Sequence, residues 1–256
     1  MSIFPLDAVR NAPIDRTIEP ILEDVREEIF RFPDWPATGL GDAEDVVAAF
    51  DLARPRLNVL AAAVSATGCR TCVDISTGLG FLPRVLVRLG IDTLATEASP
   101  SISVFLRQQG HDVRPYRIGQ TAPPFEQGTV PTLIFAEVLE HVKLAPGRVL
   151  QELATLLQPG GRLLLTTPNV ARVAHLEALA AGENFLEPFP EDLPEGADPT
   201  DHVEHVREYS VREVVDAIEG VGLGVERVVM TGWGELGYAP LANPYANDII
   251  VVEASK

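Results

Sequence analysis

Two glutamates and a histidine follow a short apolar run in the middle of the chain, at Glu137, Glu140 and His141. Their spacing is i, i+3 and i+4, so a helix beginning here would carry all three side chains on one face. Two carboxylates and an imidazole suit Mg, Mn, Fe or Zn, and oxygen-rich sites favour the harder ions. A later histidine, His205, could complete such a shell from across a cleft.

Three interpretations of this cluster stay open from the residues alone. The cluster binds a divalent metal, or His141 or His205 acts as a metal-free general base, because an imidazole can accept a proton near neutral pH. In the third interpretation the histidine is structural, and a neighbouring carboxylate satisfies its ring. The first two interpretations predict His141, His205 and Glu140 as the catalytic residues.

A second group of residues has the composition of a nucleotide-binding loop. The segment Val73-Asp74-Ile75-Ser76-Thr77-Gly78-Leu79-Gly80 runs from an apolar strand into a turn, and a helical pattern starts directly after it. Glycines there let the backbone approach a ligand closely, and the helix N-terminus offers free N–H groups. Glu97 follows about 20 positions later, at the end of the next expected strand, where a carboxylate accepts hydrogen bonds from ribose hydroxyls.

Two cofactors compete for this loop. The dinucleotide fingerprint Gly-x-Gly-x-x-Gly fails here, because Pro83 stands where the third glycine belongs. The S-adenosylmethionine (SAM) loop Asp-x-Gly-x-Gly-x-Gly matches Asp74–Gly80, with Ser76 in place of the first glycine.

The elements that must position these residues alternate between short apolar runs and helical patterns. We expect strands at Thr71–Ile75, Asp92–Thr96, Asp112–Tyr116, Thr132–Ala136, Arg162–Thr167, Val225–Met230 and Asp248–Glu253. We expect helices at Phe81–Leu89, Ser101–Gln109, Arg148–Leu157 and Ser210–Glu219. This alternation predicts βαβ units and a mostly parallel sheet of the α/β class.

The remaining segments are placed around that sheet. Residues 1–66 are expected to form an N-terminal helical extension, with helices near Ile18–Ile29 and Ala43–Ala66, and residues 67–256 the main domain. Residues 170–206 are rich in proline and acids and are predicted to be a lid or loop over the acceptor. A late excursion carries four polar or aromatic residues that either line an acceptor pocket or face a partner subunit in a homodimer: Trp233, Tyr238, Asn243 and Tyr245.

Charge and composition exclude several classes of protein. The 256 residues include 20 Lys+Arg and 37 Asp+Glu, so the net charge is 20 − 37 = −17, which argues against a nucleic-acid partner. A hydrophobic content of 46% is enough for a core. No apolar run approaches the roughly 18 residues that a membrane span needs, and the N-terminus does not resemble a signal peptide. Cys69 and Cys72 are expected to pack in the core of a cytoplasmic protein.

Four segments, taken together and in order, resemble the class I SAM-dependent methyltransferases. Besides the loop at Asp74–Gly80, they are Phe135–Val142, Leu157–Arg162 with Thr167-Pro168-Asn169, and His205–Ser210. The resemblance covers about residues 70–254 and implies a doubly wound Rossmann-like sheet of seven strands, the last one antiparallel. It implies SAM contacts at Asp74, Ser76, Gly78, Gly80, Glu97, Gln120 and Ala136. The sequence departs from the family pattern at Ser76, Gln120 and Thr132.

The Glu-x-x-Glu-His pattern is similar to that of two metal-dependent branches of this family, the ubiquinone-biosynthesis O-methyltransferases and the small-RNA 2′-O-methyltransferases. The resemblance implies a divalent ion bound by Glu137, Glu140, His141 and His205, with His202 as the second choice for the last ligand. We therefore expect methyl transfer from SAM to a hydroxyl of a small molecule or sugar. The alternatives are an RNA 2′-O-methyltransferase and a protein that binds SAM without methyl transfer.

Overall fold

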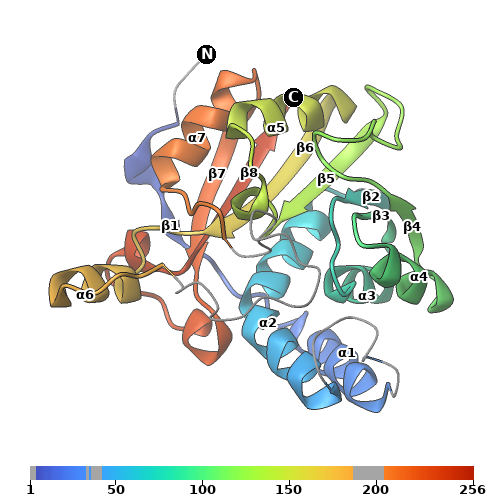
Figure 1. Ribbon diagram of the computed structural model, residues 1–256, viewed down its shortest axis with the longest axis horizontal. Helices are drawn as coiled ribbons and strands as arrows, with labels where there is room; N and C mark the ends of the chain where they lie inside the picture. The colour runs from blue at the N-terminus through green and yellow to red at the C-terminus, as the bar shows by residue number, and fades with distance from the viewer. Residues whose placement is uncertain (1–3, 33–34, 36–41, 187–204) are drawn as a thin grey trace, which may run out of the picture.

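A single eight-stranded sheet forms the middle layer of the computed structural model, which describes residues 4–32, 35, 42–186 and 205–256. The strand order is β1-β7-β8-β6-β5-β2-β3-β4, with helices on both faces (Figure 1). The strands are β1 (Arg10–Asn11), β2 (Thr71–Asp74), β3 (Asp92–Glu97), β4 (Asp112–Pro115), β5 (Val130–Ala136), β6 (Leu157–Pro168), β7 (Gly224–Thr231) and β8 (Ile249–Ser255). The α-helices are α1 (Glu19–Arg31), α2 (Ala43–Ala66), α3 (Phe81–Arg88), α4 (Pro100–Gln108), α5 (Pro146–Leu156), α6 (Val173–Ala181) and α7 (Val211–Gly220).

The pairing of the strands confirms the predicted doubly wound α/β fold. Strand β8 is antiparallel to both β6 and β7, whereas the other paired strands run parallel. Strand β1 is an addition to the expected seven, and its two residues pair in parallel with Val229 and Met230 of β7 at the sheet edge. Two residues are too few to give an alternating pattern, so this strand was not predicted.

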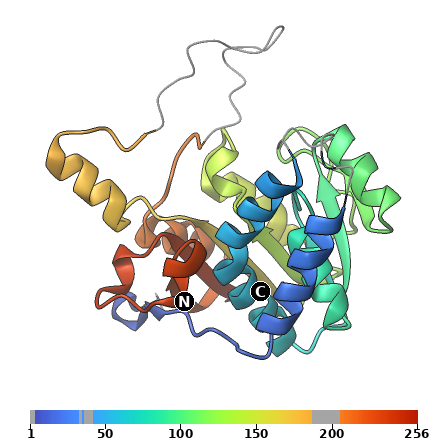
Figure 2. The ribbon, with the colours of Figure 1, turned by 90° about the horizontal axis from the view of Figure 1, so that it is seen from below.

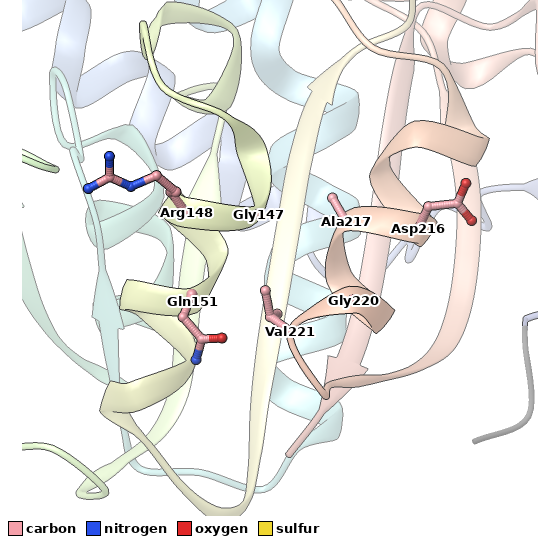
Figure 3. Close-up of a pocket in the computed structure, with 7 residues that line it drawn as sticks. All are labelled: Gly147, Arg148, Gln151, Asp216, Ala217, Gly220 and Val221. Atoms are coloured by element: carbon pink, nitrogen blue, oxygen red, sulfur yellow. The ribbon is translucent and has the colours of Figure 1, made fainter.

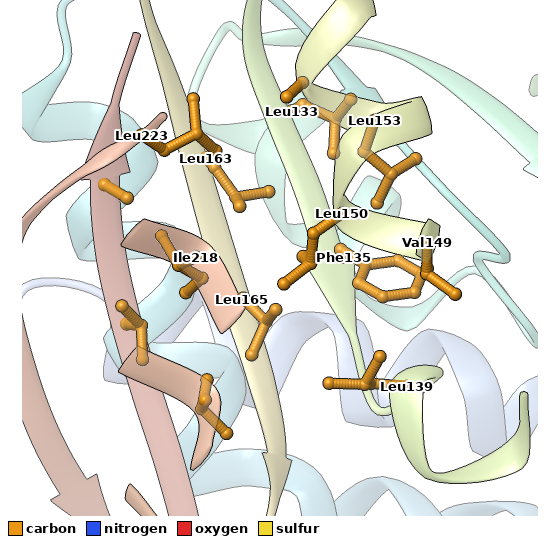
Figure 4. Packing of buried hydrophobic residues seen from close by; sticks show 14 of the residues in the cluster. Leu133, Phe135, Leu139, Val149, Leu150, Leu153, Leu163, Leu165, Ile218 and Leu223 are labelled. Carbon is orange, nitrogen blue, oxygen red and sulfur yellow. The ribbon is translucent and has the colours of Figure 1, made fainter. Parts of the chain in front are cut away.

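Alternating side chains of the central strands supply two separate cores. In β5, Leu133 and Phe135 face α5 and α7, while Ile134 between them belongs to the core beneath α1 to α4. This division follows from the strand period of two, which sends successive side chains to opposite faces. Figure 4 shows the first core, in which Leu150 and Leu153 of α5 lie over Leu133 and Phe135. The carboxyl ends of β2, β3 and β5 are thereby fixed next to one another.

The two N-terminal helices cover one face of the sheet, with α2 packed against β6 and α3, and α1 packed against α2 and α3. Leu22 and Val25 of α1 share a core with α2, α3 and α4. Helix α2 has the bounds predicted for it, because Asp42 caps its start by accepting hydrogen bonds from the backbone of Glu44 and Asp45. The proposed domain boundary after residue 66 stays a prediction.

The prediction of a loop over residues 170–206 was wrong in its first part. Val173–Ala181 form helix α6, which projects from the edge of the protein (Figure 2). Its outer positions Val173, Leu176 and Leu179 are exposed. The prolines further along the segment favoured a loop, but the Ala- and Leu-rich stretch before them has high helix propensity. Residues 187–204 of the predicted lid lie outside the described residues.

Among the helices that the structure describes, none has the length and hydropathy to cross a bilayer.

We predict that Asn58→Ala lowers the free energy of unfolding by about 2–4 kcal/mol. Asn58 is fully buried in α2, where its side chain accepts from Asp15 N and donates to Asp15 O and to Glu19 Oε1. Truncation leaves these groups unsatisfied in a small cavity. Urea unfolding followed by circular dichroism measures the loss, and Asn184→Ala on the exposed surface serves as the control. Equal midpoints for the two variants would contradict this role of Asn58.

Candidate functional site

The glycine loop after β2 has the left-handed backbone of a nucleotide-binding turn. Gly78 and Gly80 have φ of 56° and 72°, and Ser76 keeps φ at 59° although it carries a Cβ. Such a conformation costs a non-glycine residue about 1–3 kcal/mol and persists only when its surroundings hold it. Here Thr96 of β3 accepts from Ser76 N through Oγ1 and from Thr77 N through its carbonyl oxygen. The serine therefore replaces the family glycine without changing the turn.

Glycine is favoured at the last position of this loop, because Gly80 has φ of 72°, a conformation that strains a residue with a Cβ. Gly80 precedes α3, and a Cβ placed there would come within 2.8 Å of Leu106 Cδ2. The first turn of α3 thus lies close to the loop, with its backbone N–H groups available to a ligand.

Glu97 lies against the loop, as its predicted role requires. Its Oε2 accepts a hydrogen bond from Gly78 N at 3.0 Å, and its Oε1 accepts from Ser99 N at 2.8 Å. The carboxylate is buried at the carboxyl end of β3. It therefore reaches the position at which a ribose would meet the loop.

Asp74 ends β2 beneath the loop and is almost fully buried. Its Oδ2 accepts from Thr77 Oγ1 at 2.6 Å. Burial raises the pKa of Asp74 to about 7, and the negative charge of Glu97 adds to the rise. Asp74 thus supports the loop from below.

The two other predicted cofactor contacts sit at the margins of this region. Gln120 is exposed in the turn after β4, and its backbone N donates to Arg117 O. Ala136 is the last residue of β5, half-buried and paired with Thr166. The SAM contacts predicted for these residues stay predictions.

The prediction of one helical face for Glu137, Glu140 and His141 was wrong. Only Leu139–His141 form a helical turn, of the 3₁₀ type (η3), and Glu137 before it has φ of 53°. A left-handed non-glycine residue turns the chain sharply, so Glu137 does not share a helical face with the other two, and its carboxylate lies outside the group of ligand atoms formed by Glu140, His141 and His205.

Glu137 makes an ion pair with Arg56 rather than joining the histidines. Its Oε2 lies 2.8 Å from Arg56 Nη1, and its Oε1 accepts from Thr166 Oγ1 at 2.8 Å. Arg56 belongs to α2, and no hydrogen-bond partner for its buried Nε is found in the part of the chain that the structure describes. Sequence analysis missed Arg56, because no local pattern marks an arginine in a helix as part of a distant site.

Glu140 is fully buried at the end of the site. Its Oε2 accepts from Thr167 Oγ1 at 3.0 Å, whereas its Oε1 has no hydrogen-bond partner among the residues that the structure describes. Burial raises the pKa of this carboxyl well above its ordinary value, and the charge of Glu137 raises it further. A buried oxygen without a donor calls for a proton or a cation at that position.

Two imidazoles approach that buried carboxyl. His141 Nε2 lies 3.9 Å from Glu140 Oε1, and the rings of His141 and His205 meet edge to face with centroids 5.0 Å apart. One ligand atom from each of Glu140, His141 and His205 lies within 4.8 Å of the others, so the three could hold one metal ion. His202 lies outside the described residues. The donor set of one carboxylate and two imidazoles suits Zn, Fe or Mn.

A buried carboxylate stands behind His205. Glu208 Oε1 lies 3.2 Å from His205 Nδ1 and 3.0 Å from Arg172 Nη2. Burial alone would raise the pKa of Glu208, but the hydrogen bond from His205 and the charge of Arg172 hold it below its ordinary value. Glu208 was also not predicted as a site residue, because nothing in the sequence distinguishes it from the many other acidic residues.

Cys72 lies in the core as predicted, and two residues of the late excursion have contacts within the fold, while their role in an acceptor pocket or at a partner subunit stays a prediction. Cys72 is buried, and burial raises the pKa of its thiol to about 12, so it is no nucleophile at neutral pH. Tyr238 donates to Glu19 of α1, and Trp233 lies under the guanidinium of Arg172.

A shallow groove of about 520 Å³ between α5 and α7 is separate from this site (Figure 3). Its lining consists of Gly147, Arg148, Gln151, Asp216, Ala217, Gly220 and Val221, none of which was predicted to bind cofactor or metal.

We predict that the protein loses stability relative to its Asp74→Asn variant as the pH rises from 4 to 7. The folded protein keeps the proton of Asp74 up to about pH 7, whereas the unfolded chain releases it near 3.8. Over this range the unfolded state binds fewer protons, so the free energy of unfolding falls by up to about 1.4 kcal/mol per pH unit. Urea unfolding of both proteins at several pH values measures the difference. Parallel curves would show that Asp74 is ionised throughout.

Comparison with known proteins agrees with this geometry. A family model described as a methyltransferase domain matches residues 42–228. The ubiquinone biosynthesis O-methyltransferase of Cupriavidus pinatubonensis is 32% identical over 123 residues, which cover 46% of this chain and 49% of that protein. The enzyme of the same name from Xanthomonas oryzae is 28% identical over 141 residues, or 53% of this chain and 58% of that protein. The match thus spans about half the length of these relatives.

Solved structures share the fold at low sequence identity. A SAM-dependent methyltransferase from Archaeoglobus fulgidus has a TM-score of 0.56 at 13% identity, covering 80% of this chain and 97% of that one. The magnesium protoporphyrin IX methyltransferase of Synechocystis, solved with bound S-adenosylhomocysteine (SAH), has a TM-score of 0.55 at 15% identity, covering 91% and 93%. Because the family model spans most of the chain and the fold and loop agree with it, this chain belongs to the class I SAM-dependent methyltransferases.

Proposed function

We propose that this protein transfers the methyl group of SAM to a hydroxyl of a small molecule, with a divalent cation bound by Glu140, His141 and His205. The unpartnered Oε1 of Glu140 carries this proposal. A fully buried carboxylate is costly to retain unless a proton or a cation neutralises it, and the two imidazoles beside Glu140 supply the further ligands that a divalent ion needs. The relatives named ubiquinone biosynthesis O-methyltransferase support an oxygen acceptor.

The fourth ligand implied by the resemblance, Glu137, does not fit this set in the present geometry. Its two oxygens are engaged by Arg56 and Thr166. We therefore propose three protein ligands, which leaves coordination positions for the acceptor oxygen.

The bound groups and the protein divide the chemistry between them. When bound, SAM supplies an electrophilic methyl group and the divalent ion lowers the pKa of a coordinated hydroxyl. The chain itself holds the ribose through Glu97 and presents the loop around Gly78 to the cofactor. Arg56 is half-buried and pairs with Glu137 at this acidic edge, and we propose that it orients the carboxylate of the cofactor.

Three alternatives to this function are a metal-free reaction, an RNA acceptor and SAM binding without methyl transfer. In a metal-free reaction, His141 or His205 would remove the acceptor proton as a general base. The net charge of −17 counts against an RNA acceptor, since phosphate binding needs clustered Lys and Arg. Ser76 departs from the family pattern but keeps the left-handed turn, which supports SAM binding by this loop.

We predict that Glu140→Gln weakens Mn²⁺ binding by more than about 100-fold, because even changes behind a ligand cost 10–100-fold. The amide keeps the volume and can accept from Thr167, so the fold and SAM affinity should persist. Calorimetric titration with Mn²⁺ and with SAM measures both, and Glu126→Gln on the exposed surface is the control. Full methyl transfer by the unmodified enzyme in excess EDTA would refute the metal and favour the general base.

We predict that Glu97→Gln weakens SAM binding by about 1–3 kcal/mol, because a charge-assisted hydrogen bond to the ribose is lost. Asp92→Asn at the exposed opposite end of β3 is the matched control and should leave the dissociation constant unchanged. If Glu97→Gln binds SAM as tightly as the unmodified protein, the ribose does not lie on Glu97.

A further inference from the structure

The carboxylate of Glu208 is among the most buried acidic groups near the candidate site, at 6% side-chain exposure. It approaches Nδ1 of His205, the histidine that comes to the site from the far end of the predicted lid. This contact has no part in the chemistry proposed above, and no motif assigns a role to Glu208.

Glu208 is held in place from several sides. Arg172, which directly precedes α6, pairs with it at 3.0 Å and lies over the ring of Trp233, 4.6 Å from the ring centroid. Nδ1 of His175 in α6 lies 3.5 Å from the second oxygen, Oε2, but it is hydrogen-bonded to Val170 O at 3.1 Å, so Oε2 is buried without a hydrogen-bond partner among the described residues. The backbone of the next residue is fixed as well, because Val170 N donates to Tyr209 O. The carboxylate therefore offers a rigid acceptor to His205.

A rigid acceptor selects one form of a neutral imidazole. A carboxylate can only accept, so the ring nitrogen that faces it must carry the hydrogen. In a neutral imidazole the other nitrogen then keeps its lone pair. For His205 this places the hydrogen on Nδ1 and the lone pair on Nε2.

We propose that Glu208 is a positioning residue that holds His205 in the Nδ1–H form and presents the Nε2 lone pair to the cluster of Glu140 and His141. The use of that lone pair for a metal or for a proton rests on the proposed function; the form of the ring does not. Arg172 and His175 join this carboxylate to α6, so the arrangement also fixes the base of α6 relative to His205.

Long-range ¹H–¹⁵N NMR of the metal-free, SAM-free protein tests the proposal directly, at a pH where the imidazole is neutral. The chain has five histidines, so comparison with His205→Gln assigns the signals of His205. We expect the Nδ1–H form in the unmodified protein and a shift toward the Nε2–H form in Glu208→Ala. The Nε2–H form in the unmodified protein, or an unchanged spectrum in Glu208→Ala, would overturn the proposal.

A second pair of variants covers the case in which Glu208→Ala does not fold. Arg172→Met keeps the contact between Glu208 and His205, so His205 should stay in the Nδ1–H form. Arg172→Met combined with Glu208→Leu removes both charges and leaves no unpaired buried ion, and His205 should then lose that form. Identical His205 signals in the single and the double variant would contradict the role of Glu208.

Cobalt binding distinguishes this proposal from the proposed function. Visible absorption during titration with Co²⁺ should show about 10–100-fold weaker binding in Glu208→Ala. Glu213→Ala, which removes a nearby carboxylate that contacts Arg207 and Ser210, should bind as the unmodified protein does. If the unmodified protein binds no Co²⁺ but shows the Nδ1–H form, the metal fails and the role of Glu208 stands. If Co²⁺ binds with equal affinity to the unmodified protein, Glu208→Ala and Glu213→Ala, Glu208 does not position a metal ligand.

Discussion

Burying several carboxylates at one edge of a sheet is the constraint on which the site depends. Asp74 ends β2 and Glu137 follows β5, its neighbour in the sheet. In this buried region the charge of Glu97 raises the pKa of Asp74 and the charge of Glu137 raises that of Glu140, so the carboxylates repel one another. Arg56 meets this repulsion from the other layer, pairing with Glu137 and lowering the pKa of Asp74 and Glu140 against the larger effect of their burial. Helix α2 is thus part of the site, and not only a cover for the core.

Glu140, the carboxyl that Arg56 does not pair with, determines the rest of the site. Glu140 keeps a bare oxygen, and its backbone carbonyl accepts from Val206 N and Arg207 N. These two hydrogen bonds bring the chain after the predicted lid to η3 and place His205 beside His141. The backbone carbonyl of Glu140 therefore brings His205 to the position at which its imidazole meets that of His141. Burial and the charge of Glu137 account for the proton affinity of Glu140, and the two imidazoles beside it account for its suitability as a metal ligand.

Much of this could be predicted from the sequence, because periodic patterns are local. The strand alternation located β2, β3 and β5, and the helical pattern over Ala43–Ala66 predicted the bounds of α2. The association of Glu140, His141 and His205 was anticipated, but the left-handed turn at Glu137 was not, since a positive φ at a non-glycine residue has no sequence signature. Arg56 and Glu208 were missed because their partners are distant in sequence or are set by the three-dimensional packing. Helix α6 was missed because downstream prolines outweighed its helix propensity.

The central claim is that Glu140, His141 and His205 together bind one divalent ion. Anomalous diffraction from crystals grown with Mn²⁺ and SAH tests it most directly. The account predicts a single strong anomalous peak in contact with Glu140 Oε1 and with one nitrogen of each of the two imidazoles. A map without a peak there, with the carboxyl of Glu140 donating its proton to a neighbouring group, would contradict it.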